Sequence, residues 1–559
     1  MLADRPSPMP VQTRRPSVPG RLWKWIDENL IELTRQMRVS YLPPLMIYMA
    51  AGISGLTGIV GIFFVKDYLG LSAEFLAALG FWAGIPWTLK MPLGHLVDLI
   101  WRWKSVLVFL GAALIAISFA VMLGLLGHNP VMVRYMSVEA WFVLSVLLAP
   151  LGYVIQDVVA DAMTVEAVPL VDDAGAPFDP KAVKLMHTTM QTLGRVAIVG
   201  GGILVSVVNI VMFSGVNAMT GAEKAAVYIS IYKMALIIPV VSVLGVFSAM
   251  FLQRTHARKL RRLGFTSERV RELLDPHGET VHANWWLLGG SLVYAAFILA
   301  MGLGRVPFDQ EIVFVGSLAI VLLLMARLLK ELTPADRRAL VGTAVIIFMF
   351  RALPGSGAGS SWWQIDELGF DQQFLANLSL ISGGFGLFGM FVFRRFMAEK
   401  SIAYVVGFLT IMGTLLSLPI VGLYYGLHNW TSALTHGVVD ARFIAIIDTA
   451  LESPLGQVAM IPMLAWIAQT APPQLKATYF AVMASFTNLA LSLSSLGTKY
   501  LNQVFIVTRQ VLDASTGATK IPADYGELGR LLITVTVLGL LLPMATIVIV
   551  QKSPLRSRQ

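Results

Sequence analysis

Residues 139–168 read EAWFVLSVLLAPLGYVIQDVVADAMTVEAV, and residues 441–470 read ARFIAIIDTALESPLGQVAMIPMLAWIAQT. Each run is apolar and long enough to cross a bilayer as a helix, and each carries two acids one helical turn apart: Asp157 with Asp161, and Asp448 with Glu452. This spacing places both acids of a pair on one face of a helix. An ionisable side chain at the bilayer centre costs about 2.5–3.5 kcal/mol, so four of them indicate a polar pathway through the membrane.

The composition predicts an all-α polytopic membrane protein. Of the 559 residues, 56% are hydrophobic and only 13% are charged. The apolar runs are about 20 residues or longer, whereas strands of a membrane barrel would alternate over about 10 residues. The net charge of +9 reflects basic loops on one side of a membrane, so we infer no nucleic-acid partner. The absence of cysteine excludes a disulfide framework and a cysteine metal site.

Fourteen apolar runs are candidate transmembrane helices. They are 43–65, 73–97, 105–127, 139–168, 183–213, 227–253, 285–304, 311–330, 339–360, 372–395, 401–425, 441–470, 476–506 and 527–551. With both termini in the cytoplasm, about 29 Lys and Arg fall in cytoplasmic segments and about 8 in outer ones, which is the expected asymmetry.

Setting aside 285–304 and 311–330 leaves six helices in each half, the arrangement of the major facilitator fold with two parallel repeats around a central cavity. We interpret the two extra helices as a peripheral hairpin. The predicted organisation is a basic, amphipathic N-terminal segment (1–42), a six-helix bundle (43–253), a cytoplasmic linker containing the inserted hairpin (254–338), a second six-helix bundle (339–551) and a cytoplasmic tail (552–559). The first segment has helical spacing suited to the inner membrane surface, and a partly ordered tail is an equal alternative.

Two arginines lie at the same predicted depth as the acids. Arg195 and Arg351 are each about 12 residues inside a predicted helix, which places them near the middle of the bilayer. Each therefore needs a buried carboxylate or an anionic ligand. The structural alternative is that Arg195 pairs with an acid of the preceding helix and holds two helices together. Lys233 and Lys499 lie nearer to helix ends, from which they can reach the interface, so we leave both out of the site.

The acids also predict coupling to protons. Burial and like charge both disfavour two neighbouring carboxylates that are fully ionised, so such a pair can share a proton. The candidates for proton coupling are Asp157, Asp161 and Glu452. Sodium coupling is the alternative, because helix-bound carboxylates also bind sodium.

The second predicted helix ends in Ile85-Pro86-Trp87-Thr88-Leu89-Lys90-Met91-Pro92-Leu93-Gly94, with Asp98 and Arg102 in the short loop that follows. Gly94 with Asp98 and Arg102 resembles, in a degenerate form, the major facilitator loop between helices two and three, in which a glycine permits close helix approach and an acid–base pair latches one conformation. This resemblance implies that Lys90, Gly94, Asp98 and Arg102 serve the conformational change. This run resembles the folate–biopterin transporter family of the major facilitator superfamily. Three further stretches agree in family order: Gln156 to Ala162 with Glu166, Pro354 to Ser356 followed by Glu367 to Phe370, and Leu455 to Gln457 through Pro472, Pro473, Ala477 and Thr478.

The resemblance implies a secondary transporter of folate-like or pterin-like organic anions. A pterin ring donates paired hydrogen bonds to a carboxylate and stacks on aromatic rings, and a folate tail carries negative charge. The expected ligands are Asp161 or Glu452 for the ring, Trp87, Tyr153 or Trp362 for stacking, and Arg195 or Arg351 for the tail. Asp157 and Asp448 are further candidates for substrate binding. Packing or an interfacial belt is the more common role of membrane aromatics, and Trp362 and Trp363 fit the belt.

Other classes of function find less support. No phosphate-binding loop is present, and the histidines lack metal-ligand spacing, so we expect neither an ATP-driven pump nor an enzyme, and no metal or cofactor. The muropeptide permeases share part of the same motifs and are the nearest alternative. A non-transporting assembly factor on a transporter fold is the alternative from another class. The predicted location is the bacterial inner membrane, with lipid, protons and a small solute as partners.

Overall fold

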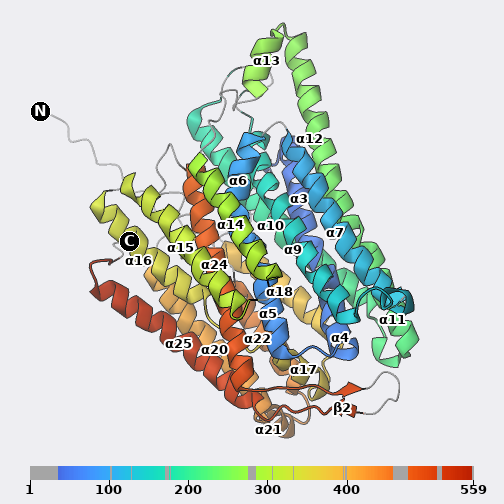
Figure 1. The fold of residues 1–559 in the computed structure, drawn as a ribbon. Coiled ribbons are helices and arrows are strands. Elements are labelled where there is room, and N and C mark those ends of the chain that lie inside the picture. Colours follow the sequence, from blue (N-terminus) through green and yellow to red (C-terminus); the bar gives the residue numbers. More distant parts are fainter. Residues whose placement is uncertain are drawn as a thin grey trace, which may run out of the picture.

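The computed structural model describes residues 35–100, 103–127, 129–169, 178–274, 285–304, 306–331, 333–393, 400–456, 476–512 and 519–556, with residues 171, 176 and 396. The described chain is almost wholly helical. Two helical halves lie side by side, and the N-terminal half runs from α3 to α12 while the C-terminal half runs from α16 to α25 (Figure 1).

The N-terminal half follows the predicted runs closely. Its elements are η2 (Val39–Tyr41), α3 (Leu42–Ile53), η3 (Ser54–Thr57), α4 (Gly58–Tyr68), α5 (Ala73–Gly84), η4 (Ile85–Leu89), α6 (Lys90–Leu99), α7 (Lys104–Gly127), α8 (Asn129–Met132), α9 (Val138–Ala167), α10 (Pro180–Met212), η6 (Val216–Ala218), α11 (Gly221–Ala235) and α12 (Ile237–Arg262). Capping sets several of the starts: the Ser137 hydroxyl accepts from the Ala140 N–H at the start of α9, and Thr220 with Glu223 forms a capping box at the start of α11.

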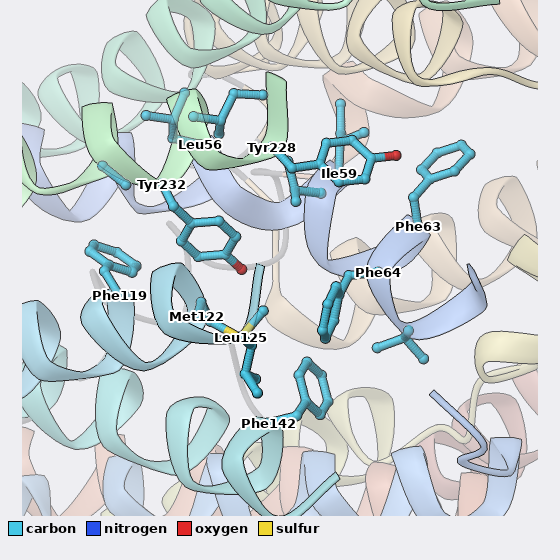
Figure 2. Packing of buried hydrophobic residues seen from close by; sticks show 14 of the residues in the cluster. Leu56, Ile59, Phe63, Phe64, Phe119, Met122, Leu125, Phe142, Tyr228 and Tyr232 are labelled. Carbon is cyan, nitrogen blue, oxygen red and sulfur yellow. The ribbon is translucent and has the colours of Figure 1, made fainter. Parts of the chain in front are cut away.

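The core of this half is a cluster of aromatic and aliphatic side chains from several helices. Figure 2 shows Phe64 of α4, Phe119 of α7, Phe142 of α9 and Tyr232 of α11 converging with their aliphatic neighbours. Because lipid tails are as apolar as these side chains, the stabilisation comes mainly from close packing between helices.

The C-terminal half follows a short helix, α13 (Ser267–Leu274), and the inserted hairpin. The hairpin consists of α14 (Trp285–Leu303) and α15 (Asp309–Leu328), followed by η7 (Leu329–Glu331). The elements of the half are α16 (Pro334–Arg351), α17 (Ala358–Asp366), α18 (Gln372–Val392), α20 (Ile402–Tyr424), α21 (Leu427–Leu434), α22 (Ala441–Glu452), η8 (Ser453–Leu455), α24 (Lys476–Val504), β1 (Val511–Leu512), β2 (Thr519–Ile521) and α25 (Leu528–Lys552). The two strands pair antiparallel.

Nine segments in the described part of the chain are long and apolar enough to span a membrane. They are Val39–Tyr68, Lys104–Gly127, Val138–Thr164, Thr189–Ala218, Gly221–Arg262, Asp309–Ala326, Gln372–Val392, Ile402–Tyr424 and Leu528–Lys552. The predicted count of fourteen therefore stays a prediction. Two of the other predicted spans, 73–97 and 339–360, are interrupted helices, and 441–470 is described only as far as residue 456.

Interruptions near mid-span are the main departure from the predicted helices. The run 43–65 contains η3, the run 73–97 contains η4 at Pro86, and 441–470 contains η8 at Pro454. Proline lacks an N–H and clashes with the preceding turn, which accounts for η4 and η8. Broken helices of this kind place free backbone polar groups beside the binding sites of membrane transporters.

The break after Arg351 is the most complete. Between α16 and α17 the chain leaves the helix for several residues, and Gly357 takes a φ of 73°, which favours glycine. Side chains of α24 satisfy the exposed backbone: the Ser494 hydroxyl donates to the Leu353 carbonyl at 2.5 Å, and the Gly355 N–H donates to the Thr498 hydroxyl at 2.8 Å. Buried backbone groups need such partners in a bilayer, so α24 holds this break open.

The two halves meet along two helix pairs, α5 with α24 and α10 with α18. The inserted hairpin packs on the flank of the first pair, against α24, α6 and α5, and so touches both halves. Two polar contacts hold it there: the Tyr294 and Thr88 hydroxyls share a hydrogen bond of 2.6 Å, and Glu311 pairs with Lys499 at 3.1 Å. Lys499 thus forms an ion pair inside the protein, whereas the sequence predicted that its side chain reaches the membrane interface.

The halves are joined at the end of the bundle that carries the two strands, called here the β1–β2 end; the opposite end is the α13 end (Figure 1). The joining contacts are Lys66 with Asp366 at 2.6 Å, Gln372 with the Tyr228 hydroxyl at 2.8 Å, Asn217 with Asp371 at 2.8 Å, Gln503 with Glu74 at 2.6 Å, and Arg509 with the Lys66 carbonyl at 2.7 Å. Trp362 is 2% exposed and lies beneath the Arg509 guanidinium, so the belt interpretation of this residue is wrong.

Candidate functional site

The acids of the N-terminal half form a compact charged cluster with Lys90. Its ammonium group lies 2.6 Å from an Asp157 oxygen and 2.8 Å from an Asp161 oxygen. The Tyr48 hydroxyl donates to the other Asp161 oxygen at 2.6 Å. Four elements thus contribute to or hold the cluster: α3 brings Tyr48, η4 and α6 bring Lys90, and α9 brings both acids.

The break at η4 sets the position of Lys90. Lys90 is the first residue of α6, directly after η4, and its side chain is 19% exposed. Because a buried ion pair loses hydration, it is retained only where both partners are well satisfied, and removing one partner is strongly destabilising. The three side chains together carry one net negative charge, so the cluster is nearly neutralised inside the N-terminal half.

Arg195 and Arg351 approach each other from opposite halves. Arg195 of α10 lies within electrostatic range of both Asp157 and Arg351. Within the described residues neither arginine forms an ion pair with a carboxylate, and the Arg351 Nε is buried without a hydrogen-bond partner. The predicted alternative, Arg195 bonded directly to Asp157 or Asp161, is therefore not what the structure shows: Lys90 occupies that place. Two neighbouring cations without acidic partners are suited to an anion.

Asp448 and Glu452 differ from the acids of the first half. Both lie on α22 just before η8, and they are close enough to repel each other. In the part of the chain that the structure describes, neither acid forms an ion pair, and one Asp448 oxygen is buried without a partner. Glu452 is exposed. This acid pair is therefore not neutralised by a cation of the described chain, and one of its oxygens lacks a hydrogen-bond partner.

A cavity of about 600 Å³ lies between the halves beside this second acid pair. Its lining comes from α4 and α10 of the first half and from α18, α22 and η8 of the second: Ile59, Ile62, Val199, Leu375, Leu378, Ser379, Ser382, Gly383, Gly386, Thr449, Glu452, Ser453 and Gly456. The wall is apolar apart from hydroxyls and one carboxylate. Such a composition, mostly apolar with a few convergent polar groups, is typical of sites for small organic molecules.

The predicted aromatic ligands lie elsewhere on the same helices. Trp87 is half-buried in η4, and its carbonyl accepts from the Asn488 amide at 3.1 Å across the junction of the halves. Tyr153 is half-buried and packs against the aromatic cluster of the first half. Neither is among the residues that line the cavity in this conformation.

The predicted gating loop is only partly described. The Asp98 side chain and Arg102 lie outside the described residues. An added Cβ at Gly94 would meet no described atom within 4 Å, so close helix packing does not explain this glycine in the present conformation. Next to this loop, Lys104 forms an ion pair of 2.5 Å with Glu166 and ties α7 to α9 at the α13 end.

Sequence reasoning missed two features of the site. One is Tyr48: a tyrosine inside a transmembrane run needs a hydrogen-bond partner for its hydroxyl, and that need was the available signal. The other is the ion pairing of Lys90, which the sequence indicated only as a residue of the conformational change and which binds Asp157 and Asp161. No cluster of potential metal ligands occurs among the described residues.

The fold and the site together define the class of protein. A solved structure of a POT family transporter in complex with 5-aminolevulinic acid superposes with a TM-score of 0.57 at 12% identity, covering 92% of this chain and 96% of that one. A variant of the nucleoside transporter NupG superposes with a TM-score of 0.52 at 10% identity, covering 91% of this chain and 99% of that one. The chain is therefore a multi-pass membrane protein with the major facilitator transporter fold.

The particular family follows from sequence. The model of the BT1 family matches residues 51–557, and the chain belongs to that family. A protein of Synechocystis sp. (strain ATCC 27184 / PCC 6803 / Kazusa), named folate-biopterin transporter, is 29% identical over 150 residues, which are 27% of this chain and 29% of that protein. The predicted resemblance to the folate–biopterin transporters is confirmed.

Proposed function

We propose that this protein is a proton-coupled secondary transporter of folate-like or pterin-like organic anions, working by alternating access. The observation that carries the proposal is the cavity between the halves, lined by Glu452 and by helices of both halves. A site formed by both halves changes its access when the halves rock against each other.

In this proposal the acids and the arginines bind different parts of the solute. Asp448 and Glu452 accept the paired hydrogen bonds of an amino-pyrimidinone edge, because a carboxylate binds such an edge through two parallel bonds. Arg195 and Arg351 attract the anionic part of the solute, since they lack acidic partners among the described residues. The name of the Synechocystis relative, folate-biopterin transporter, supports this choice of solute.

Coupling is assigned to the cluster of Lys90, Asp157 and Asp161. A proton that enters this cluster weakens the attraction between Lys90 and an acid, which alters the contact of α6 with α9. Because α6 follows η4 and η4 contacts α24 of the other half, such a change is passed to the junction of the halves. Proton entry and rocking are thereby linked.

The same proposal orients the protein with its α13 end in the cytoplasm of a bacterium. Basic residues concentrate at this end, on the last turns of α12 and on α13. The contacts at the β1–β2 end then close the site from the outside. In this proposal the described conformation is one that is closed to the outside.

Uptake into proteoliposomes tests the proposal. Labelled folate and a labelled pterin are supplied with and without an inward proton gradient. We expect accumulation that needs the gradient, that a protonophore abolishes, and that Glu452→Gln reduces strongly. Glu527→Gln is the matched control, because Glu527 is a surface acid paired only with Arg530. Failure of the purified protein to move any folate or pterin under either condition would contradict the proposal.

A further inference from the structure

A second cavity, of about 890 Å³, lies at the α13 end of the C-terminal half. It is formed where the first turns of α16 and α20 meet the last turn of α25 and the chain that follows it. Its lining residues are Ala335, Arg338, Ser401, Ala403, Tyr404, Ile547, Gln551, Ser553, Pro554 and Arg556. None of these residues lines the cavity between the halves.

The segment after α25 is fixed in place by a close contact. The Leu555 carbonyl lies so near to Gly342 of α16 that an added Cβ would come within 2.0 Å of it. Only glycine permits this approach. The turn is also closed by its own hydrogen bonds: the Ser553 hydroxyl donates to the Val550 carbonyl at 2.8 Å, and the Arg556 N–H donates to the Ser553 carbonyl at 3.2 Å. The turn therefore holds Arg556 over the cavity.

The cavity is positively charged. Arg338 and Arg556 approach it from different elements, and neither forms an ion pair within the described residues. No acidic side chain is among the lining residues. A third cation, Lys400, lies next to the cavity with its ammonium 5.6 Å from the centre of the Tyr404 ring. Arginines without acidic partners bind phosphate oxygens through paired hydrogen bonds.

The cavity also borders the lipid-facing surface. Only 11% of the residues in the most apolar part of α25 are buried inside the protein, and Ile549 is 67% exposed. Tyr404, which lines the cavity, is 55% exposed. The site thus combines an apolar side that faces acyl chains with a basic side at the level of the headgroups. Basic pockets between transmembrane helices are a known way of binding anionic headgroups.

We propose that this cavity binds the phosphate headgroup of an anionic phospholipid from the leaflet at the α13 end. Arg338 and Arg556 hold the phosphate, and the acyl chains lie along α20 and α25. The lipid then joins α16, α20 and the turn after α25.

Titration with defined lipids tests this site. The purified chain in a neutral detergent is titrated with phosphatidylglycerol, with phosphatidylcholine of the same acyl chains, and with inorganic phosphate. Bound lipid is counted by native mass spectrometry, and the unfolding temperature is followed in parallel. We expect one tightly bound phosphatidylglycerol and a rise in unfolding temperature that neither phosphatidylcholine nor inorganic phosphate reproduces.

Two double variants separate the site from general charge. Arg338→Gln with Arg556→Gln is expected to weaken phosphatidylglycerol binding by at least about tenfold, since a hydrogen bond to a charged group contributes about 1.5–3 kcal/mol. Arg337→Gln with Arg261→Gln removes two exposed charges from the same end of the molecule, outside the cavity, and is expected to bind as the unaltered chain does.

The outcomes that overturn the proposal are distinct. Equal losses in both double variants would show a diffuse charge effect, and equal binding of phosphatidylcholine would show that the phosphate charge is not recognised. A matching effect of inorganic phosphate would identify a free-phosphate site instead of a lipid site. If the cavity variant unfolds without lipid, Arg338→Lys with Arg556→Lys replaces it, and this pair must retain part of the binding.

Discussion

The two acid pairs of this protein have the same spacing and opposite surroundings. Asp157 and Asp161 are both bonded to Lys90, while Asp448 and Glu452 have no cationic partner among the described residues, and Glu452 lines a cavity. The two acid pairs are spaced alike along their helices, and the neighbouring helices decide their surroundings. In the proposed function the neutralised pair responds to protons, whereas the unneutralised pair is available to a solute through Glu452.

Removing Lys90 should give the largest effect. Lys90→Gln leaves two acids facing each other without a cation, so we expect a loss of about 3 kcal/mol in stability and no measurable uptake. Thermal unfolding in detergent and uptake into proteoliposomes measure both. The double variant Lys90→Gln with Asp157→Asn restores the net charge of the cluster and should recover much of the stability but not the uptake. A single variant as stable as the unaltered chain would contradict the role given to this lysine.

A substitution of Arg351 tests whether this arginine binds an anionic solute. Because its guanidinium has no carboxylate partner in the described chain, Arg351→Gln should leave the unfolding temperature nearly unchanged. Uptake of an anionic solute at low concentration should fall by about 10-fold or more, the loss expected for one hydrogen bond to a charged group. Arg530→Gln, at an exposed surface ion pair, is the control. A large loss of stability with unchanged apparent affinity would show that Arg351 is structural.

The two acid pairs can be compared directly by the same substitution in each half. Asp157→Asn breaks an ion pair and should lower stability, whereas Asp448→Asn removes a half-buried charge that repels Glu452 and has no cationic partner among the described residues, and should raise stability by about 1 kcal/mol. Both should lower uptake. Parallel unfolding curves give the sign of each change. Equal changes of stability in the two variants would remove the distinction between the pairs.

Asp371 offers a smaller test with a fully partnered acid. Although burial alone would raise it, the pKa of Asp371 is held below its ordinary value by the Phe374 N–H, Asn217 and Arg442. A lowered folded-state pKa contributes stability above the ordinary carboxyl pKa, and this is lost as the pH falls through the lowered value. Asp371→Asn keeps the helix cap, so we expect a difference of at most about 1 kcal/mol near neutral pH that shrinks in acid. A difference that grows in acid would contradict this sign.

Much of the architecture could be predicted from sequence, because apolar runs have bounds that capping residues and charges define. The run 139–168 corresponds to α9 and 527–551 to α25, each within one residue. The breaks could not be placed in the same way. Apolar residues continue through η3, η4 and the segment after Arg351, so the hydrophobic pattern alone predicts unbroken helices there. The open backbone after Arg351 is stabilised by hydrogen bonds from a distant helix, α24.

The candidate site residues stay predictions, and how they pair could not be predicted from sequence. Depth along a helix correctly brought Arg195 near Asp157, but depth does not tell which cation reaches an acid first. The break at η4 turns Lys90 toward α9, and that turn follows from three-dimensional packing with α24. The lack of an acid beside Arg351 depends on the relative placement of the halves, which no local pattern contains.

The central claim is that solute binds in the cavity between the halves, beside Glu452. The chain has no cysteine, so Ser382→Cys would place a single thiol on the wall of this cavity, where Ser382 is exposed. The rate of its reaction with a maleimide is measured with and without folate or a pterin, and Ser118→Cys, at a buried position of the first half, is the control. The account predicts that the solute slows labelling at position 382 in proportion to its occupancy, while the control stays unreactive. Labelling at an unchanged rate in the presence of a solute that the protein demonstrably transports would contradict it.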